Sequence, residues 1–342
     1  MTRQSPPSMA DVARHAGVSP QTVSRVSNGY PGVLEPTRVK VLASMAALKY
    51  RPNSAARALK RGSFQSIGVL ISGLTTTGNM RTLGAIVASA AEQGYSLTLK
   101  TLDSFSDEAL QLAFSDLKDS AIDAAILLLE IASADEIHLK DLVYDRVVIV
   151  DSNAAGRYPV VDTDQASGTR EALEHLHGLG HRRIQHVTGT ANSYSSRRRV
   201  EAWRGFLEEH GLDVPEPVVG DWSAGSGYAA GARIAETGGV TAVFASNDEM
   251  ALGLMRAFGE RGIRVPEDVS VVGFDDIELA GQFPTPLTTV HQDFGEVGRR
   301  CVAEVVRQID TGVVEPGVDL VPTRLIVRES TAPPPPVPFT PR

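Results

Sequence analysis

The sequence predicts a small all-α helix-turn-helix headpiece, followed by an α/β core of two doubly wound parallel-sheet subdomains. The first 50 residues contain short helical patterns joined by a tight glycine turn. From residue 66 onward, apolar β-rich runs alternate with helical stretches, and this alternation occurs in two sets, at about 66–160 and 163–290. A chain of 342 residues is long enough for two or three domains.

The first predicted helix begins near Ser8. Ser8 is a good N-cap, and Asp11, three residues later, completes a capping box. Gly17 interrupts the helical pattern and should end the helix. The apolar side of this helix comprises Val12, Ala13 and Ala16.

The second predicted helix has the features of a DNA-recognition helix. Ser19 should cap it, Pro20 suits its first position, and Asn28-Gly29 should end it. Val23 and Val26 should face inward. A short helix that is polar on its outer side and follows a tight turn is typical of a helix-turn-helix. The residues that we expect to face DNA are Ser19, Pro20, Gln21, Thr22, Ser24, Arg25 and Asn28.

The third predicted helix runs from about Pro36 to Leu48. Its apolar residues at helical spacing are Val39, Leu42, Met45 and Leu48. We expect these to complete the small core with the first two helices.

Charge separates the front of the chain from the rest. Residues 1–61 contain ten Lys/Arg and two Asp/Glu, a net charge of +8, whereas the whole chain carries −8. Residues 62–342 therefore carry −16. A basic head on an acidic body favours a polyanionic partner, such as double-stranded DNA, at one end only.

The segment after Pro52 predicts a hinge helix of about two turns that is disordered alone. Isolated helices below roughly 12 residues are marginal in water, so this one should fold only against a partner. Its composition suits the DNA minor groove, where small residues allow close approach and an apolar side chain can enter a base step. A plain linker is the alternative. The candidate contacts here are Asn53, Ala56, Arg57 and Leu59.

The predicted strands of the core are apolar on both faces, as in parallel sheets covered by helices on both sides. Between them lie helical patterns such as 83–94 and 167–180, and a further helix near 294–309 is followed by a last strand in TRLIVRE. The chain should therefore cross between its two subdomains more than once. The predicted strands are 66–72, 95–101, 124–129, 146–150, 183–189, 241–246, 269–274 and 287–290, with a short one in PVVG at 217–220.

Polar residues that follow these strands mark a candidate ligand site. Ligands of open parallel sheets bind at the carboxyl ends of strands, and between two lobes they bind in the cleft. Carboxylates, amides and a guanidinium can bind paired sugar hydroxyls, and an indole can cover the C–H side of a sugar ring. An Asp after a strand is often only a turn former, which is the interpretation we favour for Asp248 and Asp276. The candidates are Asp151, Arg199, Trp222, Asn247, Asp275 and Gln292.

Other chemistry finds little support in the sequence. Cys301 is the only cysteine, so no internal disulfide can form. The glycines at 225–231 miss the dinucleotide-binding spacing, and a zinc site at His175, His177 and His181 would need a further ligand. We therefore expect no enzyme activity, no cofactor and no metal. No apolar run approaches the length of a membrane span and no signal peptide is evident, so we expect a cytoplasmic protein.

The segments MADVARHAGVSPQTVSRVSNG, LKYRPNSAARAL and IGVL, in this order, resemble the LacI/GalR family of bacterial transcription regulators. The resemblance runs from about Ala10 to Glu329. It implies a DNA-binding headpiece, a hinge helix and a periplasmic-binding-protein-like core that binds a small sugar. One departure is Pro20, which stands where many relatives have a base-contacting residue, so the operator sequence stays open.

Within that family, GDWSAGSG, SNDEMALG and VSVVGFDD are most similar to the lactose-type members. The resemblance implies that the matching positions line an effector pocket, and Ser72 and Arg81 are further candidates on its N-terminal side. The matching positions are Asp151, Arg199, Trp222, Asn247, Asp275, Gln292 and Phe294.

The resemblance also implies a homodimer that binds a near-palindromic operator and that a sugar releases, for example a β-galactoside or another oligosaccharide. A corepressor-dependent regulator and a plain solute-binding receptor are the alternatives. We expect these domains: a headpiece at 1–51, a hinge at 52–65, a core at 66–330 and a disordered tail at 331–342. Within the core we expect an N-lobe of about 66–161 plus 293–321, and a C-lobe of about 162–292 plus 322–330.

Overall fold

The computed structural model describes residues 7–50, 62–74, 76–102, 107–129 and 145–336. Backbone contacts divide the chain into two compact units, Met1–Phe64 and Gln65–Arg342. Each unit is described by itself below.

The first unit consists of three helices, α1 (Met9–Ala16), α2 (Pro20–Ser27) and α3 (Glu35–Ala47). The predicted capping box of α1 is confirmed, because the Ser8 hydroxyl accepts from the Asp11 amide and the Asp11 carboxylate accepts from the Ser8 amide. This box fixes where α1 begins.

The first unit has its own hydrophobic core, but α3 contributes to it differently from the prediction. Val39 and Leu42 are 56% and 50% exposed, so their predicted inward orientation is wrong. Val41 and Met45, four residues apart, form the stripe that packs inward, and Val39 lies two residues from Val41, on nearly the opposite side of the helix. The buried apolar residues are Val12, Ala13, Ala16, Val23, Val26, Val41 and Met45.

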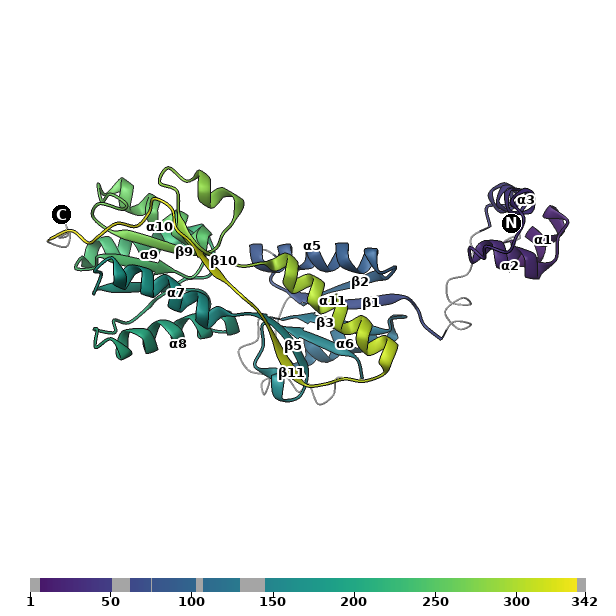
Figure 1. The fold of residues 1–342 in the computed structure, drawn as a ribbon, viewed down its shortest axis with the longest axis horizontal. Coiled ribbons are helices and arrows are strands. Elements are labelled where there is room, and N and C mark those ends of the chain that lie inside the picture. Colours follow the sequence, from purple (N-terminus) through teal and green to yellow (C-terminus); the bar gives the residue numbers. More distant parts are fainter. Residues whose placement is uncertain (1–6, 51–61, 75, 103–106, 130–144, 337–342) are drawn as a thin grey trace. The chain divides into compact units, whose positions relative to one another are not determined.

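The second unit contains two six-stranded sheets (Figure 1). The first sheet has the strand order β11-β5-β4-β3-β1-β2, and all its described pairings are parallel. Its strands are β1 (Ser66–Ser72), β2 (Ser96–Leu102), β3 (Ala124–Leu128), β4 (Val147–Val150), β5 (Pro159–Thr163) and β11 (Gly317–Val321).

The second sheet has the order β12-β10-β9-β8-β6-β7. Its pairings are parallel except at the edge, where β12 runs antiparallel to β10. Its strands are β6 (Ile184–Thr188), β7 (Val218–Val219), β8 (Ala242–Ala245), β9 (Ser270–Asp275), β10 (Thr288–His291) and β12 (Arg324–Ile326).

Helices cover both faces of each sheet, which confirms the predicted fold class. On the first sheet α5 and α11 share one apolar cluster and α6 belongs to another; on the second, α9 and α10 pack on one side and α7 and α8 on the other. Within the described residues, no helix is both long and apolar enough to cross a bilayer. The helices are α5 (Thr77–Glu92), α6 (Asp107–Asp119), α7 (Gln165–Gly178), α8 (Tyr194–Glu209), α9 (Ala224–Thr237), α10 (Asp248–Glu260) and α11 (Phe294–Thr311).

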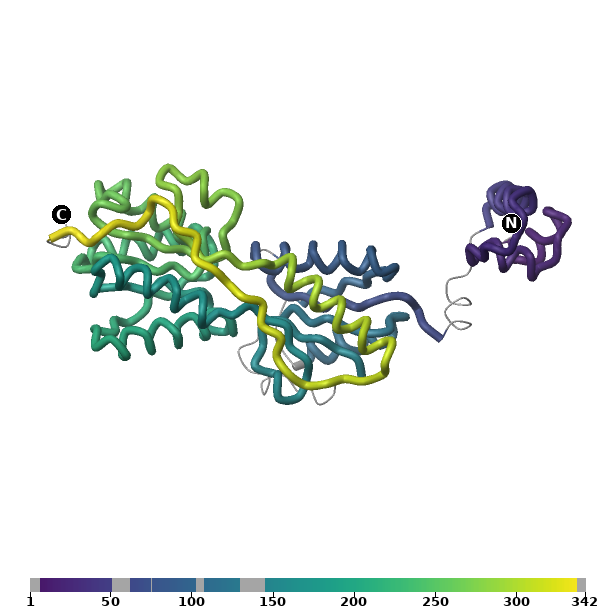
Figure 2. Tube along the Cα trace, viewed as in Figure 1, coloured from purple at the N-terminus to yellow at the C-terminus, as the bar shows by residue number. Residues whose placement is uncertain are grey.

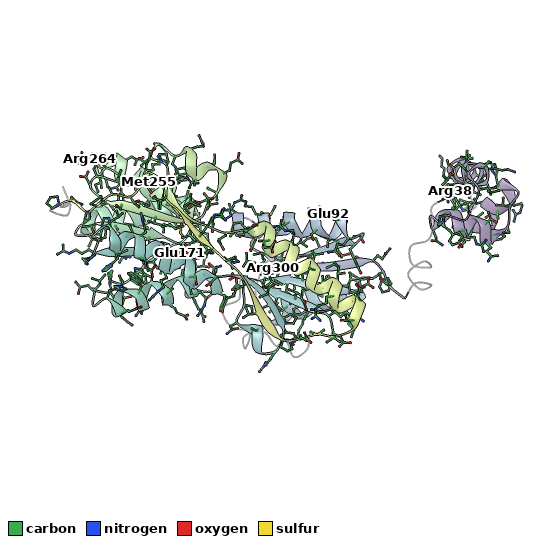
Figure 3. All side chains as sticks on the ribbon, viewed as in Figure 1. Arg38, Glu92, Glu171, Met255, Arg264 and Arg300 are labelled. Carbon is green, nitrogen blue, oxygen red and sulfur yellow. The ribbon has the colours of Figure 1, made fainter. Side chains whose placement is uncertain are left out.

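The chain passes between the sheets at three places, which Figure 2 traces: after β5, after β10 and after β11. A side-chain ion pair links α11 to β11 in the first sheet. Arg300 on α11, labelled in Figure 3, pairs with Asp319 on β11 at 2.6 Å, and it also pairs with Glu296 of its own helix at 2.8 Å. We call the half built on the first sheet the N-lobe and the half built on the second sheet the C-lobe.

Two strands, β5 and β11, were not among the predicted ones. Most of β11 is exposed, so no apolar run marks it in the sequence. β5 contains the buried Asp162 and begins with a proline, and both residues are unusual in strands.

Two of the glycines at 225–231, Gly227 and Gly231, serve helix packing. A Cβ atom at Gly227 would lie 2.1 Å from the Met250 carbonyl oxygen, and one at Gly253 would lie 1.9 Å from the Ala224 carbonyl oxygen. Helices α9 and α10 therefore approach so closely that their contact requires bare backbone on both sides.

We predict that Gly253→Ala destabilises the core by about 2–3 kcal/mol, because the added methyl group overpacks the α9–α10 contact. Gly259→Ala is the matched control on the same helix, since a Cβ added at Gly259 would meet no atom within 4 Å. Its stability should be unchanged or rise by about 0.5–1 kcal/mol. Urea unfolding of both variants measures the difference, and equal stabilities would contradict the packing argument.

Candidate functional site

The outer face of α2 presents the predicted DNA-contacting residues of the first unit. Ser19, Pro20, Gln21, Arg25 and Asn28 are exposed, and Thr22 and Ser24 are partly exposed. The predicted hinge contacts Asn53, Ala56, Arg57 and Leu59 lie outside the described residues.

Two contacts prearrange this face. The Ser19 and Thr22 hydroxyls lie 2.9 Å apart at the start of α2, where Ser19 also caps the helix. The Arg25 guanidinium lies over the Tyr30 ring, 5.5 Å from its centre. A stacked guanidinium loses less freedom when it binds a base or a phosphate.

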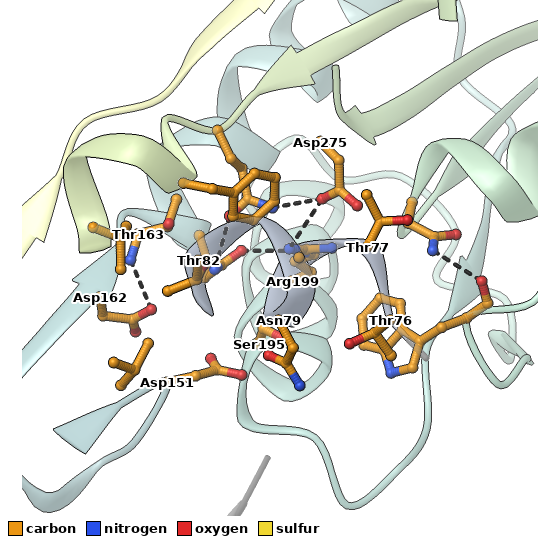
Figure 4. A pocket seen from close by; sticks show the side chains of 18 residues that line it. Thr76, Thr77, Asn79, Thr82, Asp151, Asp162, Thr163, Ser195, Arg199 and Asp275 are labelled. Atoms are coloured by element: carbon orange, nitrogen blue, oxygen red, sulfur yellow. Dashed lines mark hydrogen bonds and ion pairs between the residues drawn. The ribbon is translucent and has the colours of Figure 1, made fainter. Parts of the chain in front are cut away.

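The second unit contains a cavity between its two lobes (Figure 4). About 610 Å³ of space between the lining atoms belongs to it, including space that is open to solvent. Its walls come from the carboxyl ends of strands in both sheets and from the helix starts that follow them. The lining residues are Thr76, Thr77, Gly78, Asn79, Thr82, Val150, Asp151, Asp162, Thr163, Gln165, Ser195, Arg199, Trp222, Asn247, Asp275, Gln292, Phe294 and Val297.

Seven of the nine predicted effector residues line this one cavity: Asp151, Arg199, Trp222, Asn247, Asp275, Gln292 and Phe294. Ser72 and Arg81 are not among the lining residues. Ser72 is buried at the end of β1, where its backbone carbonyl accepts from the side-chain Nδ2 of Asn79 at 2.9 Å. Arg81 is exposed and lies over the Phe294 ring, 5.5 Å from its centre, so it supports a wall residue.

Sequence reasoning missed most of the N-lobe wall. Asp162 and Thr163 end β5, so the same strand-end rule would have found them had this strand been recognised. On the C-lobe side sequence reasoning missed Gln165 and Ser195, which open α7 and α8, because nothing in the sequence distinguishes them from ordinary residues at a helix start. Four further lining residues, Thr76, Thr77, Asn79 and Thr82, belong to the start of α5.

A ring of polar contacts surrounds the buried Arg199. Arg199 Nε donates to Gln165 Oε1 at 2.8 Å, and Gln165 Nε2 donates to Gln292 Oε1 at 3.4 Å. Gln292 Nε2 donates to Asp275 Oδ1 at 2.5 Å, and this oxygen lies 4.0 Å from Arg199 Nη2. The ring therefore closes on Arg199, which also donates to the Ser246 carbonyl and stacks on Phe274.

Three cavity residues have a left-handed backbone although they are not glycine. The φ angles are +58° at Asp151, +72° at Trp222 and +109° at Asp275. Such conformations are strained for these residues and occur often at functional sites. Here they lie where the chain leaves the strand ends.

Trp222 depends on Gly189 for its position. A Cβ at Gly189 would lie 2.1 Å from the indole, so the ring rests directly on the glycine backbone. Asn247 fixes the adjoining backbone, because its Nδ2 donates to the Trp222 carbonyl at 2.9 Å while its Oδ1 caps α10 at the Met250 amide.

The cavity contains more carboxyl groups than cations. Burial raises the pKa of Asp275 to about 7, although Arg199 acts in the opposite direction. Burial also raises the pKa of Asp151 to about 6, and it raises that of Asp162, where the charge of Asp151 adds to the effect. Within the described residues, Asp151 Oδ1 and Trp222 Nε1 are buried without a hydrogen-bond partner.

Asp248 and Asp276 do not line the cavity. Asp248 accepts from the Ile277 amide and the Thr289 hydroxyl, and Asp276 pairs with Arg328 and His291. His181 bonds to Thr241 and Ser270. No cluster of three potential metal ligands occurs in the part of the chain that the structure describes.

This arrangement suits a neutral polyol. Buried carboxyl groups near neutrality accept from hydroxyls when ionised and donate to them when protonated, and the amides do both. An anionic ligand such as a phosphate would meet three acidic groups and one guanidinium, which already has partners.

Family comparisons match both units. Residues 8–53 match the bacterial regulatory proteins of the lacI family, and residues 173–331 match a periplasmic binding protein-like domain. The chain is 35% identical to the lactose operon repressor of Escherichia coli K12, over 96% of this chain and 92% of that protein. It is 31% identical to the ribose operon repressor of the same organism, over 88% of this chain and 92% of that protein.

Comparison with solved structures gives the same family. A lac repressor dimer bound to operator and the anti-inducer ONPF matches with a TM-score of 0.88 and 34% identity, covering 96% of this chain and all of that one. A complex of the transcriptional regulator CelR with cellobiose matches with a TM-score of 0.70 and 28% identity, over 95% and 99% of the two chains. This chain therefore belongs to the lacI family of bacterial regulatory proteins.

Proposed function

We propose that this protein is a cytoplasmic, sequence-specific repressor that a sugar releases from its operator. The observation that supports this most is the cavity: a guanidinium, three carboxyl groups, amides and an indole converge at the strand ends of both lobes. Two similar solved structures are a complex with cellobiose and one with bound ribose, which favours the same ligand class here.

On the DNA side, we propose a homodimer whose two α2 helices enter successive major grooves of a near-palindromic operator. Gln21 and Arg25 are exposed on α2 and carry the amide and guanidinium donors that suit adenine and guanine. The hinge residues Asn53, Ala56, Arg57 and Leu59 would then contact the minor groove at the centre.

The sugar and the operator would be coupled through the two lobes. A ligand that contacts both walls of the cavity favours a closed arrangement, which shifts the N-lobes of the dimer against each other. Coupling of this kind between two sites is typically about 1–3 kcal/mol, a 5–150-fold change in operator affinity.

The direct test is a gel shift of the full-length protein on its own upstream DNA, with and without a panel of mono- and disaccharides. Release by at least one sugar is expected. Tighter binding with sugar would indicate a corepressor, and a protein that binds neither DNA nor sugar would contradict the proposal.

We predict that Arg25→Ala weakens operator binding by about 1–3 kcal/mol but barely changes binding to a scrambled duplex, because a base contact is lost. Arg14→Ala is the matched control, since it removes the same charge from an exposed position on α1. Fluorescence anisotropy on both duplexes measures the effect. Equal losses on the two duplexes would assign Arg25 to the phosphates alone.

We predict that Arg199→Ala abolishes sugar release and leaves operator affinity within about twofold. The ring of contacts around Asp275 would lose its cation, and truncation of a buried charged partner is costly. Arg198→Ala, next to it but paired with Glu201 on the surface, should respond normally. Anisotropy with increasing sugar measures the response, and thermal unfolding checks that both variants fold. A normal response in a folded Arg199→Ala variant would show that this cavity does not sense the effector.

We predict that sugar binding weakens about tenfold between pH 8 and pH 6, as expected for one group with a pKa near 7. Sugar hydroxyls that donate to Asp275 stabilise its ionised form, so a protonated Asp275 must lose its proton before binding. Calorimetry in two buffers of different ionisation enthalpy should detect proton release, and Asp275→Asn should remove the Asp275 part of it. Affinity that rises toward pH 6 would show that the protonated form binds.

A further inference from the structure

One hydrogen bond joins the two lobes directly at the edge of the cavity. Thr77 is the first residue of α5 in the N-lobe and lines the cavity, and its hydroxyl donates to the Glu249 carboxylate. Glu249 belongs to the first turn of α10 in the C-lobe. We call this contact the interlobe bond. Neither residue belongs to the three segments in which the chain passes between the sheets, so the interlobe bond exists only while the lobes lie against each other.

Each partner of the interlobe bond is fixed within its own lobe. In the N-lobe, Asn79 ties the start of α5 to the end of β1, because its Nδ2 donates to the Ser72 carbonyl at 2.9 Å. In the C-lobe, the Asn247 side chain caps α10, and Asp248 accepts from the Thr289 hydroxyl of β10. Two side chains on fixed supports meet only over a narrow range of lobe positions, so the interlobe bond favours one arrangement of the lobes.

A cation of the N-lobe also acts on a carboxyl group of the C-lobe. Arg81 lies one turn after Thr77 on α5. Burial is the main cause of the raised pKa of Asp275; Arg199 and Arg81 oppose the increase, and the charge of Glu249 adds to it. Arg81 is therefore close enough to Asp275 to attract it. Charge draws the lobes toward the arrangement in which the interlobe bond forms.

The second oxygen of the Glu249 carboxylate limits the strength of the interlobe bond. Oε1 accepts from Thr77, but Oε2 is buried without a hydrogen-bond partner among the described residues. A buried oxygen without a partner costs free energy, which offsets part of what the bond contributes. We therefore expect the bond to shift the balance between two lobe arrangements by about tenfold, the low end for a hydrogen bond to a charged group. A bond of this size leaves a sugar able to shift the balance further.

A contact that exists in only one of two arrangements raises the population of that arrangement. The interlobe bond consists of the chain's own atoms, and it favours the same closed arrangement as a sugar that contacts both walls. We propose that Thr77 and Glu249 form a latch that sets how tightly the protein binds its operator without sugar and how much sugar its release requires. This inference rests on the proposed function and adds its regulation. Both are positioning residues, since Glu249 is not among the described lining residues of the cavity and acts through Thr77.

A double-mutant cycle on the full-length protein tests the latch through DNA binding. Fluorescence anisotropy measures the affinity for its own upstream operator, without sugar, of Thr77→Val, Glu249→Ala and the variant that carries both. Neither residue belongs to the headpiece, so any change must arise through the lobes. Each single variant should bind the operator more tightly than the unmodified protein. The double variant should match the single variants within about twofold, because the second substitution removes a bond that is already lost.

The same variants should bind sugar more weakly. Calorimetry with lactose, cellobiose and ribose measures this on the protein without DNA, at pH 8, above the pKa of about 7 at Asp275. In a two-state equilibrium, the fold gain in operator affinity multiplied by the fold loss in sugar affinity equals the fold change that the latch causes. We expect this product to be about tenfold for whichever of the three sugars binds.

Two control variants separate the latch from the charge of Glu249 and from its place in the C-lobe. Glu249→Gln keeps an acceptor for the Thr77 hydroxyl and should retain most of the unmodified behaviour. Glu236→Ala removes the same charge from an exposed position on α9 and should change neither affinity. Thermal unfolding checks that every variant folds. Small-angle X-ray scattering without sugar should give a larger radius of gyration for the double variant than for the unmodified protein.

The results distinguish the latch from the proposed function. Additive effects in the cycle, an operator affinity that neither substitution raises, or an unchanged radius of gyration would overturn the latch while release of the unmodified protein by sugar stands. If no sugar releases or binds the unmodified protein, the sugar-sensing function fails. The operator cycle and the scattering measurement, which need no sugar, then still decide whether the latch exists.

Discussion

The burial of one guanidinium organises the cavity between the two lobes. Removing a charged side chain from water costs several kcal/mol unless partners compensate for it, so Arg199 requires acceptors on every side. Gln165, Ser246 and Asp275 supply them, from α7, from the end of β8 and from β9. Because these elements are neighbours in the C-lobe, the need to satisfy one side chain brings their polar groups to one place.

The excess of carboxyl groups over cations explains why the cavity can serve a neutral ligand. With one guanidinium for Asp151, Asp162 and Asp275, ionising all three would leave uncompensated charge in a buried space, so burial raises their pKa values. An ionised carboxyl group accepts from a hydroxyl and a protonated one donates to it, so the protonation state of these groups decides which bonds a hydroxylated ligand can make.

The strand-end rule predicted the C-lobe half of the site well, because its strands are buried and easily recognised. Asp275 and Asn247 follow such strands, and their polar side chains stand out against the apolar runs. On the N-lobe side the same rule found Asp151 but missed most of the wall, because Asp162 belongs to β5, whose sequence is not typical of a strand, and Thr82 lies one turn into α5. In the headpiece the caps of the first two helices were predicted correctly. Val39 and Leu42 were wrongly placed in the core, because helical spacing shows that residues share one side of a helix but does not show which side packs inward.

Because the chain forms two units, the residues proposed to bind DNA belong to one unit and the cavity proposed to control that binding belongs to the other. The first unit has its own core, around Val23 and Val41, and residues 1–61 carry +8 while the rest carries −16. An acidic core is repelled by DNA, so attraction has to come from the basic unit. In a dimer, two such units gain affinity over one only while they can reach both half-sites together. A sugar that disturbs this geometry can therefore weaken binding greatly without touching any residue that contacts DNA.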